Sequence, residues 1–237
     1  MSNEHPNTLL GRYIPEVVSN ALHLEQVLRR MQTLAPHGTW LGSRKLGPDT
    51  AEYQFSAAAS KKPALHGIGA KTGGGYGIME APIRGCLEAG RPELGIGVRL
   101  ARLKTEEEPN PYLEHGAHVF DMNTFHSRHD ALFHGALFYV VCWGRLGTVH
   151  EKYDLLNQLK HGFLGAVPIY FVEKDGYHSD EFEFMTGHVN KVLGPRVSAE
   201  DVEGLRFINL SETSGDQFAD LVLQDIRPLV APKLVTV

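Results

Sequence analysis

Apolar residues show two different patterns along most of the chain. They recur at helical spacing from Tyr13 to Leu34, whereas the segment from Ala136 to Cys142 is apolar without interruption. Further helices are predicted over 49–62, 78–89, 124–135, 149–160, 182–192 and 213–225, with a short helical turn over 198–204. Strands are predicted over 39–41, 68–71, 94–100, 119–122, 136–142, 167–172 and 206–210.

This alternation of strands and helices predicts the fold class. Strands that are apolar throughout are typical of a parallel sheet that helices cover on both faces. We therefore expect an α/β fold, Rossmann-like and doubly wound, with a mostly parallel sheet of about six or seven strands. It is expected to form one domain, in which 1–37 are an N-terminal extension and helix, 38–226 the core, and 227–237 a C-terminal tail. Residues 1–12 are expected to be frayed or extended, and 106–111 a charged loop.

Composition narrows the partners and the compartment. The 237 residues are 42% hydrophobic and 22% charged, which is usual for a soluble globular protein. A formal net charge of -5 argues against broad binding to nucleic acid or to an anionic membrane, so neither partner is expected. The longest apolar run, 131–143, is broken by His134 and is too short to span a bilayer. Only Cys86 and Cys142 are present, far apart in sequence, and no apolar signal core precedes them, so a reducing cytoplasm is expected.

A glycine-rich segment joins a predicted strand to a predicted helix. It reads TGGGYGIME over 72–80. Glycines let the backbone approach an anion, and the free N–H groups at a helix start attract negative charge. The alternative is a tight turn without a ligand, but three consecutive glycines and a fourth favour a phosphate site. The spacing matches neither the usual dinucleotide fingerprint nor a Walker loop.

A second glycine-bearing loop, 144–148, follows the most apolar strand. Ligands of α/β proteins bind at the carboxyl ends of such central strands. Thr148 could cap the next helix and donate to a phosphate oxygen, with Glu151 turned back over the cleft. A capping box, with Thr148 as N-cap and Glu151 three residues later, explains both residues equally well without a function.

Four stretches resemble one family in order and spacing. They are TGGGYGIMEAPIR over 72–84, PNPYL over 109–113, FHSR over 125–128 and GRLGTVHE over 144–151. Together they resemble the LOG family, also labelled "lysine decarboxylase-like", which includes cytokinin-activating phosphoribohydrolases. The likeness extends from about Gly38 to the last helix. The family pattern GGGxGxM is met in full, at Gly73, Gly74, Gly75, Gly77 and Met79.

The chain departs from the family at three places. In the second motif, PGGxGTxxE, the family's proline is Trp143 here and its second glycine is Arg145. In the segment that holds the family's catalytic arginine, a lysine has become His129. An arginine side chain at 145 could block the site or add a phosphate contact.

The resemblance implies a set of site residues. Arg128 and Glu151 match the family's catalytic charges. The residues expected to bind phosphate and nucleotide are Gly42, Ser43, Gly73, Gly74, Gly75, Tyr76, Gly77, Met79, Glu80, Gly144, Arg145, Gly147 and Thr148. The core over 38–226 would then be a nucleotide-binding core.

The implied reaction is hydrolysis of the N-glycosidic bond of an AMP-like nucleoside 5′-monophosphate, which yields free base and ribose 5-phosphate. Positive charge builds on the ribose as the base departs, and the Glu151 carboxylate would stabilise it. The Arg128 guanidinium would hold ribose or phosphate oxygens and keep Glu151 ionised. No cofactor is expected, because the chain contains no motif for pyridoxal phosphate. No metal is expected either, because no metal-binding motif accompanies the 13 histidines.

Some alternatives stay open on the sequence. Tyr76, Trp143 and Met79 either line a base pocket or, in the case of Trp143, belong to the core. Arg128 and Glu151 favour an enzyme, whereas Trp143 and Arg145 favour a non-catalytic nucleotide-binding or sensing module. The resemblance also implies a homodimer or a larger even oligomer, for which the apolar helix from Tyr13 offers an interface.

Overall fold

A computed structural model describes residues 6–101, 109–189, 191 and 205–230. Within these ranges, the centre of the protein is a seven-stranded sheet of order β4-β3-β2-β1-β5-β6-β7. Each neighbouring pair of strands is parallel. The strands are β1 His37–Leu41, β2 Gly69–Thr72, β3 Gly95–Leu100, β4 His118–Met122, β5 Ala136–Cys142, β6 Ile169–Glu173 and β7 Leu205–Asn209. The predicted fold class and the predicted strands are confirmed.

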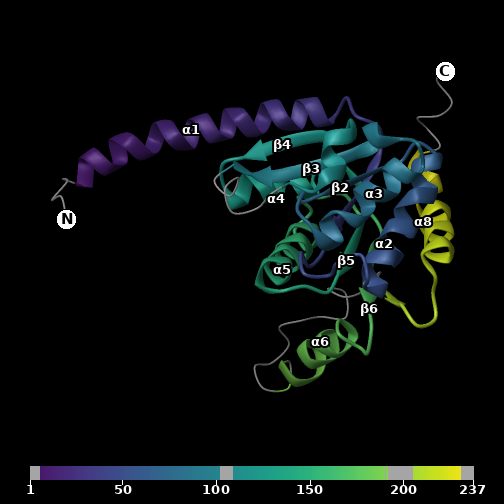
Figure 1. The fold of residues 1–237 in the computed structure, drawn as a ribbon. Helices are drawn as coiled ribbons and strands as arrows, with labels where there is room; N and C mark the ends of the chain where they lie inside the picture. Colours follow the sequence, from purple (N-terminus) through teal and green to yellow (C-terminus); the bar gives the residue numbers. More distant parts are fainter. Residues whose placement is uncertain (1–5, 102–108, 190, 192–204, 231–237) are drawn as a thin grey trace.

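Helices cover both faces of the sheet (Figure 1). Alternate residues of β5 point to opposite faces, so Val140 packs in one core cluster and Val141 in the other. The cluster that holds Val140 is covered by α2 Ala51–Leu65, α3 Ala81–Glu88 and α8 Gly215–Val230. The cluster that holds Val141 is covered by α1 Pro6–Met31, α4 Phe125–Phe133, α5 Leu146–Lys160 and α6 Ser179–Glu183. Shorter helical turns are η1 Gly77–Met79, η2 Pro92–Leu94, η4 Pro111–His115 and the π-helical η5 Phe184–Val189.

The strand order reverses at β1, which has β2 on one side and β5 on the other. The connections that leave the carboxyl ends of β1, β2 and β5 therefore diverge at this point. In open parallel sheets, such a point leaves a crevice where ligands bind. The loops after Leu41, Thr72 and Cys142 are thus the segments that the fold brings to the place of a ligand.

Two terminal predictions were wrong. Residues 6–12 are helical rather than frayed or extended, since α1 begins at Pro6, whose fixed φ suits a first helical turn. The N-terminal half of α1 extends beyond the rest of the molecule (Figure 1). The tail expected from Arg227 begins later, because α8 continues to Val230 and buries Ile226.

Three predicted segments need a different account. The helix expected over 78–89 is divided into η1 and α3, and the one expected from Val149 begins at Leu146. The helix expected over 182–192 is α6 followed by η5. The helical turn expected over 198–204, residues 231–237 and residues 106–108 of the charged loop lie outside the described residues.

Both cysteines are free and buried, and burial raises the pKa of each thiol to about 12. Neither Cys86 nor Cys142 forms a disulfide. In the described part of the chain, no helix combines the length and the apolarity that a bilayer crossing requires.

Candidate functional site

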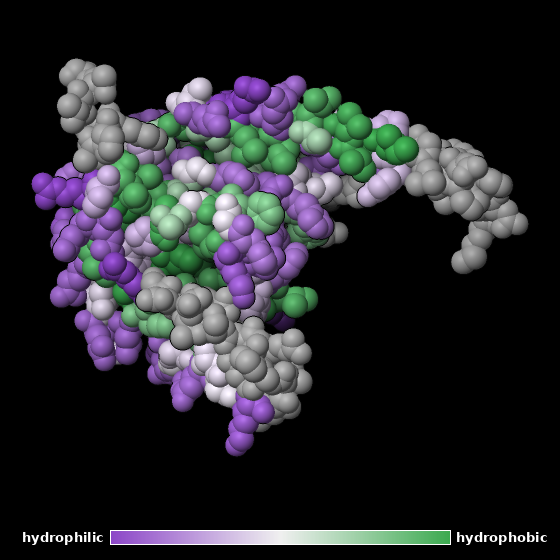
Figure 2. All heavy atoms as spheres, turned by 180° about the vertical axis from the view of Figure 1, so that it is seen from behind, coloured by the Kyte–Doolittle hydropathy of each residue, from purple (hydrophilic) through white to green (hydrophobic). Residues whose placement is uncertain are grey.

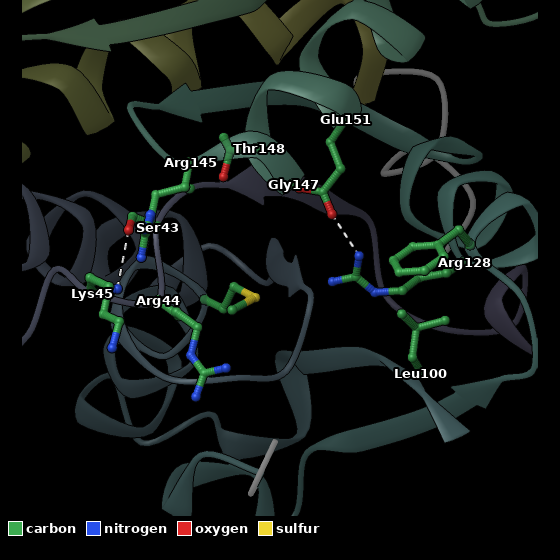
Figure 3. A pocket seen from close by; sticks show the side chains of 12 residues that line it. Ser43, Arg44, Lys45, Leu100, Arg128, Arg145, Gly147, Thr148 and Glu151 are labelled. Atoms are coloured by element: carbon green, nitrogen blue, oxygen red, sulfur yellow. Dashed lines mark hydrogen bonds and ion pairs between the residues drawn. The ribbon is translucent and has the colours of Figure 1, made fainter. Parts of the chain in front are cut away.

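A cavity of about 260 Å³ opens at the carboxyl edge of the sheet (Figure 3). It lies where the loops after β1 and β5 meet the helices α4 and α5. Its lining consists of Gly42, Ser43, Arg44, Lys45, Met79, Leu100, Phe125, Arg128, Arg145, Gly147, Thr148 and Glu151. Eight of these residues were predicted from the sequence as site residues.

Ser43 connects the three loops that leave β1, β2 and β5. Its N–H donates to the carbonyl of Trp143 at 3.2 Å, which joins the loop after β1 to the loop after β5. Its carbonyl accepts from the N–H of Ile78 at 3.0 Å, which joins it to the glycine-rich loop. The two glycine-bearing loops therefore lie at the same edge of the sheet, held together through one residue between them.

The glycines of the first loop permit close approach of protein atoms. A Cβ on Gly77, whose φ is 70°, would lie 2.5 Å from the carbonyl oxygen of Ser43. A Cβ on Gly73 would lie 2.2 Å from the Arg128 guanidinium. Asn110 of the PNPYL motif is fully buried and donates to the carbonyls of Gly74 and Gly75 at 3.2 and 3.1 Å. The first loop is thus packed by protein on several sides. Among the residues of its GGGxGxM motif, Met79 lines the cavity.

The two predicted catalytic charges form a buried ion pair. Arg128 lies on α4 and Glu151 on α5, and Nη1 of Arg128 donates to Oε1 of Glu151 at 2.6 Å. Their side chains are only 10% and 11% exposed. Nε of Arg128 donates to the carbonyl of Val98 at 3.1 Å, which fixes the plane of the guanidinium. Charge-assisted hydrogen bonds of this kind are stronger than neutral ones, so the carboxylate is held in a defined orientation.

The beginning of α5 decides the capping-box question. The helix starts at Leu146 with Arg145 as N-cap, so Thr148 occupies the third helical position and Glu151 lies nearly a turn further on. Within the described structure, Arg145 makes no side-chain capping hydrogen bond. The capping-box interpretation of Thr148 and Glu151 was wrong, because the helix begins earlier and the Glu151 carboxylate bonds to Arg128 instead.

Other predicted site residues lie away from the cavity lining. Glu80 accepts from the Tyr53 hydroxyl at 2.6 Å in a buried contact, and burial with this bond raises the pKa of Tyr53 well above its usual value. Trp143 packs against the core, and its indole Nε1 donates to Glu52 at 3.2 Å. The structure thus favours the core interpretation of Trp143. The predicted residues outside the lining are Gly73, Gly74, Gly75, Tyr76, Gly77, Glu80 and Gly144.

Four residues of the lining were not predicted, namely Arg44, Lys45, Leu100 and Phe125. The first two directly follow Gly42 and Ser43, so two consecutive cations after a strand-end loop were a signal that the sequence did contain. Leu100 and Phe125 carry no such signal, because an apolar residue at an element end is common.

The histidines do not gather into a metal centre in the described residues, where no group of three His, Cys, Asp or Glu side chains could hold an ion. His129, which stands where the family has lysine, is buried on α4 and lies 2.6 Å from Asp154 on α5 through Nδ1. This contact is a second polar link between the two helices that carry Arg128 and Glu151.

These features define a Rossmann-like α/β protein with a charged cleft at the switch point of its sheet. The family model described as "Possible lysine decarboxylase" matches residues 79–210, and the chain belongs to this LOG-like family. The family predicted from the sequence is therefore confirmed. Among curated protein sequences, none matches the chain at a significant level.

Several solved structures share the fold. The molybdenum cofactor binding protein from Rippkaea orientalis has a TM-score of 0.58 at 16% identity, over 81% of this chain and 98% of that one. The molybdenum cofactor carrier protein from Chlamydomonas reinhardtii has a TM-score of 0.54 at 19% identity, over 81% and 98%. DNA processing protein A from Helicobacter pylori, which binds single-stranded DNA, has a TM-score of 0.51 at 13% identity, over 80% and 81%. At these identities the likeness concerns the fold alone.

Proposed function

We propose that this protein hydrolyses the N-glycosidic bond of a nucleoside 5′-monophosphate. The observation that carries the proposal is the buried pair of Arg128 and Glu151 at the wall of the cavity. Burial of a carboxylate costs free energy unless a cation pairs with it, as Arg128 does here. A buried charged pair that lines a space open to a ligand is typical of a functional site.

The roles follow from charge. As the bond between base and ribose lengthens, positive charge develops on the ribose, and a carboxylate fixed beside the anomeric carbon stabilises it. Water adds to that carbon and the base leaves with a proton, so the products are free base and ribose 5-phosphate. Glu151 stabilises the ribose and orients the water, while Arg128 holds Glu151 and the ribose oxygens.

The phosphate belongs at the start of α5 in this proposal. Gly147 and Thr148 lie in the first turn of that helix and line the cavity, where free N–H groups and the helix dipole favour an anion. Gly42 and Ser43 border the same space. The predicted residues of the first loop support the site from behind, through the contacts of Gly73 with Arg128 and of Gly77 with Ser43.

The test is incubation with a panel of nucleoside monophosphates, followed by chromatography for released base. Glu151→Gln keeps the size of the side chain and removes its charge, so base release is expected to fall by about 100-fold or more. Glu88→Gln is the matched control. Like Glu151, Glu88 is paired with an arginine, but the pair of Arg84 and Glu88 lies at an exposed site on α3. Equal release from both variants would refute the catalytic role of Glu151.

A second candidate is a non-catalytic module that binds the nucleotide and keeps it. The observation in its favour is Arg145, which stands where the family has a glycine and which lines the cavity. Relatives in fold that bind or carry the molybdenum cofactor also suggest that this architecture serves carriers. Tight binding of a monophosphate without release of base by the wild type would establish this candidate.

We also propose that the protein self-associates through α1. Tyr13, Ile14, Val17, Val18 and Leu22 are exposed on this helix, and Figure 2 shows apolar side chains on the arm that leaves the body. A surface of this kind on a projecting helix is typical of an interface. Light scattering is expected to give an even multiple of 26.2 kDa at micromolar concentration, and a monomer would contradict the proposal.

A further inference from the structure

The lining of the cavity is divided by charge (Figure 3). Arg44, Lys45 and Arg145 lie together on one side, and the pair of Arg128 and Glu151 lies on the other. Glu151 is the one acid among the lining residues, and its carboxylate is already bonded to Arg128. Among the described lining residues, no acid other than Glu151 accompanies Lys45 and Arg145.

Lys45 and Arg145 carry charge that no described residue balances locally. In the part of the chain that the structure describes, neither has a carboxylate within 4.0 Å. Like charges that lie together at a cavity repel one another, and an anion between them relieves this repulsion. The arrangement thus favours a ligand with negative charge at this end.

Main-chain contacts fix the positions from which Lys45 and Arg145 extend. Arg145 has a φ of -85° and a ψ of -166°, an extended conformation that any residue adopts, so the replacement of the family's glycine brings no strain. Lys45 follows a turn in which its N–H donates to Oγ of Ser43 at 3.1 Å. The bond from Ser43 to the Trp143 carbonyl fixes the two segments relative to each other. The backbone positions of Lys45 and Arg145 at the cavity are therefore fixed.

One phosphate does not use all of these groups. The first turn of α5, with Gly147 and the Thr148 hydroxyl, offers donors for a single phosphate without help from Lys45 or Arg145. A diphosphate brings one more phosphate, with the additional negative charge that the cationic side lacks.

We infer that the preferred ligand of this cavity is a nucleoside 5′-diphosphate. Its α-phosphate lies at Gly147 and Thr148, and its β-phosphate lies between Lys45 and Arg145. For the place of the ribose, the inference rests on the proposed function. It replaces the monophosphate of that proposal by a diphosphate as the preferred ligand.

Titration calorimetry with AMP and ADP tests the inference on the full chain. ADP is expected to bind the wild type about tenfold more tightly than AMP, a difference of about 1.4 kcal/mol. In the double variant Lys45→Gln, Arg145→Gln, this preference is expected to fall below about twofold, because two solvent-exposed cations supply most of it. Arg91→Gln, at an exposed arginine before β3, is the control for the loss of positive charge and is expected to keep the preference.

Three results would overturn the inference. They are equal affinity of the wild type for AMP and ADP, an unchanged preference in the double variant, and no binding of either nucleotide. Inorganic pyrophosphate is expected to compete weakly with ADP. If pyrophosphate competes as strongly as ADP itself, the nucleoside contributes nothing to binding and the ligand is not a nucleoside diphosphate. Base release is measured separately, so a protein that prefers ADP and releases no base refutes the hydrolase and leaves the diphosphate site standing.

Discussion

The two glycine-bearing loops look alike in sequence and differ in what surrounds them. In the first loop, an added Cβ at Gly73, Gly75 or Gly77 would meet protein atoms within 2.7 Å. In the second loop, Gly144 is packed against Thr148, but a Cβ on Gly147 would meet no described atom within 4 Å. Glycine therefore marks the packing of protein on protein in one loop, and an open position beside the cavity in the other. The number of glycines alone does not distinguish these two uses.

The strongest test of this comparison is Gly77→Ala. The left-handed backbone costs an L residue about 1–2 kcal/mol, and the contact with the Ser43 carbonyl adds to it, so we expect a loss of about 2–3 kcal/mol of unfolding free energy. Urea denaturation measures it. A loss below about 0.5 kcal/mol would mean that the close approach to Ser43 is not needed for stability.

Lys71→Met tests the strand that leads into the first loop. Lys71 is fully buried, and its Nζ donates to the carbonyls of Ala131 and His134, at 3.0 and 2.7 Å, where α4 ends. The variant leaves these carbonyls without this donor, so a loss of about 2 kcal/mol in unfolding free energy is expected. Urea unfolding at neutral pH is the measurement, and an unchanged midpoint and slope would contradict the role of Lys71 as an anchor of the helix that carries Arg128.

The stability difference between the wild type and Lys71→Met is expected to depend on pH. Burial lowers the pKa of Lys71 from 10.5 to about 7 in the folded state. Between these values the unfolded chain binds more protons than the folded one, so the contribution of Lys71 to stability rises with pH from about 7 to 10.5. The stability difference between the wild type and Lys71→Met should therefore increase from pH 7 to pH 9.5. A constant difference would show that the lysine keeps its charge when buried.

Gly73→Ala is expected to lower both stability and activity. Its Cβ would lie 2.2 Å from the buried Arg128 guanidinium and 2.5 Å from the Met79 sulfur, so we expect a loss of about 1–3 kcal/mol in unfolding free energy. The pair with Glu151 is disturbed, and base release should decrease about tenfold. The control is Gly90→Ala, at an open turn after α3, which should not affect release. Full activity of Gly73→Ala would show that the guanidinium does not depend on this glycine.

The smallest effect is expected from Gly147→Ala. This glycine lies in the first turn of α5 in open surroundings, and alanine has the higher helix propensity, so stability should rise by about 0.5 kcal/mol. Thermal unfolding measures the change. A clear destabilisation would place the second loop in the same class as the first and remove the contrast between them.

The sheet was predictable because its signal is strong. The run from Ala136 to Cys142 is apolar on both faces, and the strand boundaries agree with the predicted ones within a few residues. The start of α5 was not predictable in the same way. Leu146 is exposed and Gly147 is a poor helix former, so nothing in their types indicates the first turn of a helix.

The candidate site was predictable only in part, for a physical reason. Arg128 and Glu151 were recognised through motifs of the family, and the fold brings them within hydrogen-bond distance. Ser43 was expected as a binding residue, but its connection of three loops uses main-chain atoms, which leave no trace in the side-chain pattern. Lys45 was missed although it directly follows Arg44 after a strand-end loop, because an exposed cation on a loop is common and only its neighbours in space show that it lines the cavity.

The main-chain character of the bonds at Ser43 has a consequence for how this site evolves. Because the N–H and the carbonyl of residue 43 belong to the backbone, these two hydrogen bonds do not depend on the type of side chain at position 43. An exposed position on a joined loop can also carry a different side chain while the bonds remain, as the arginine at position 145 illustrates, whereas Gly77 cannot, because a Cβ there would meet the Ser43 carbonyl. Substitution at the exposed positions can therefore change the ligand preference of the cleft while its main-chain bonds are kept.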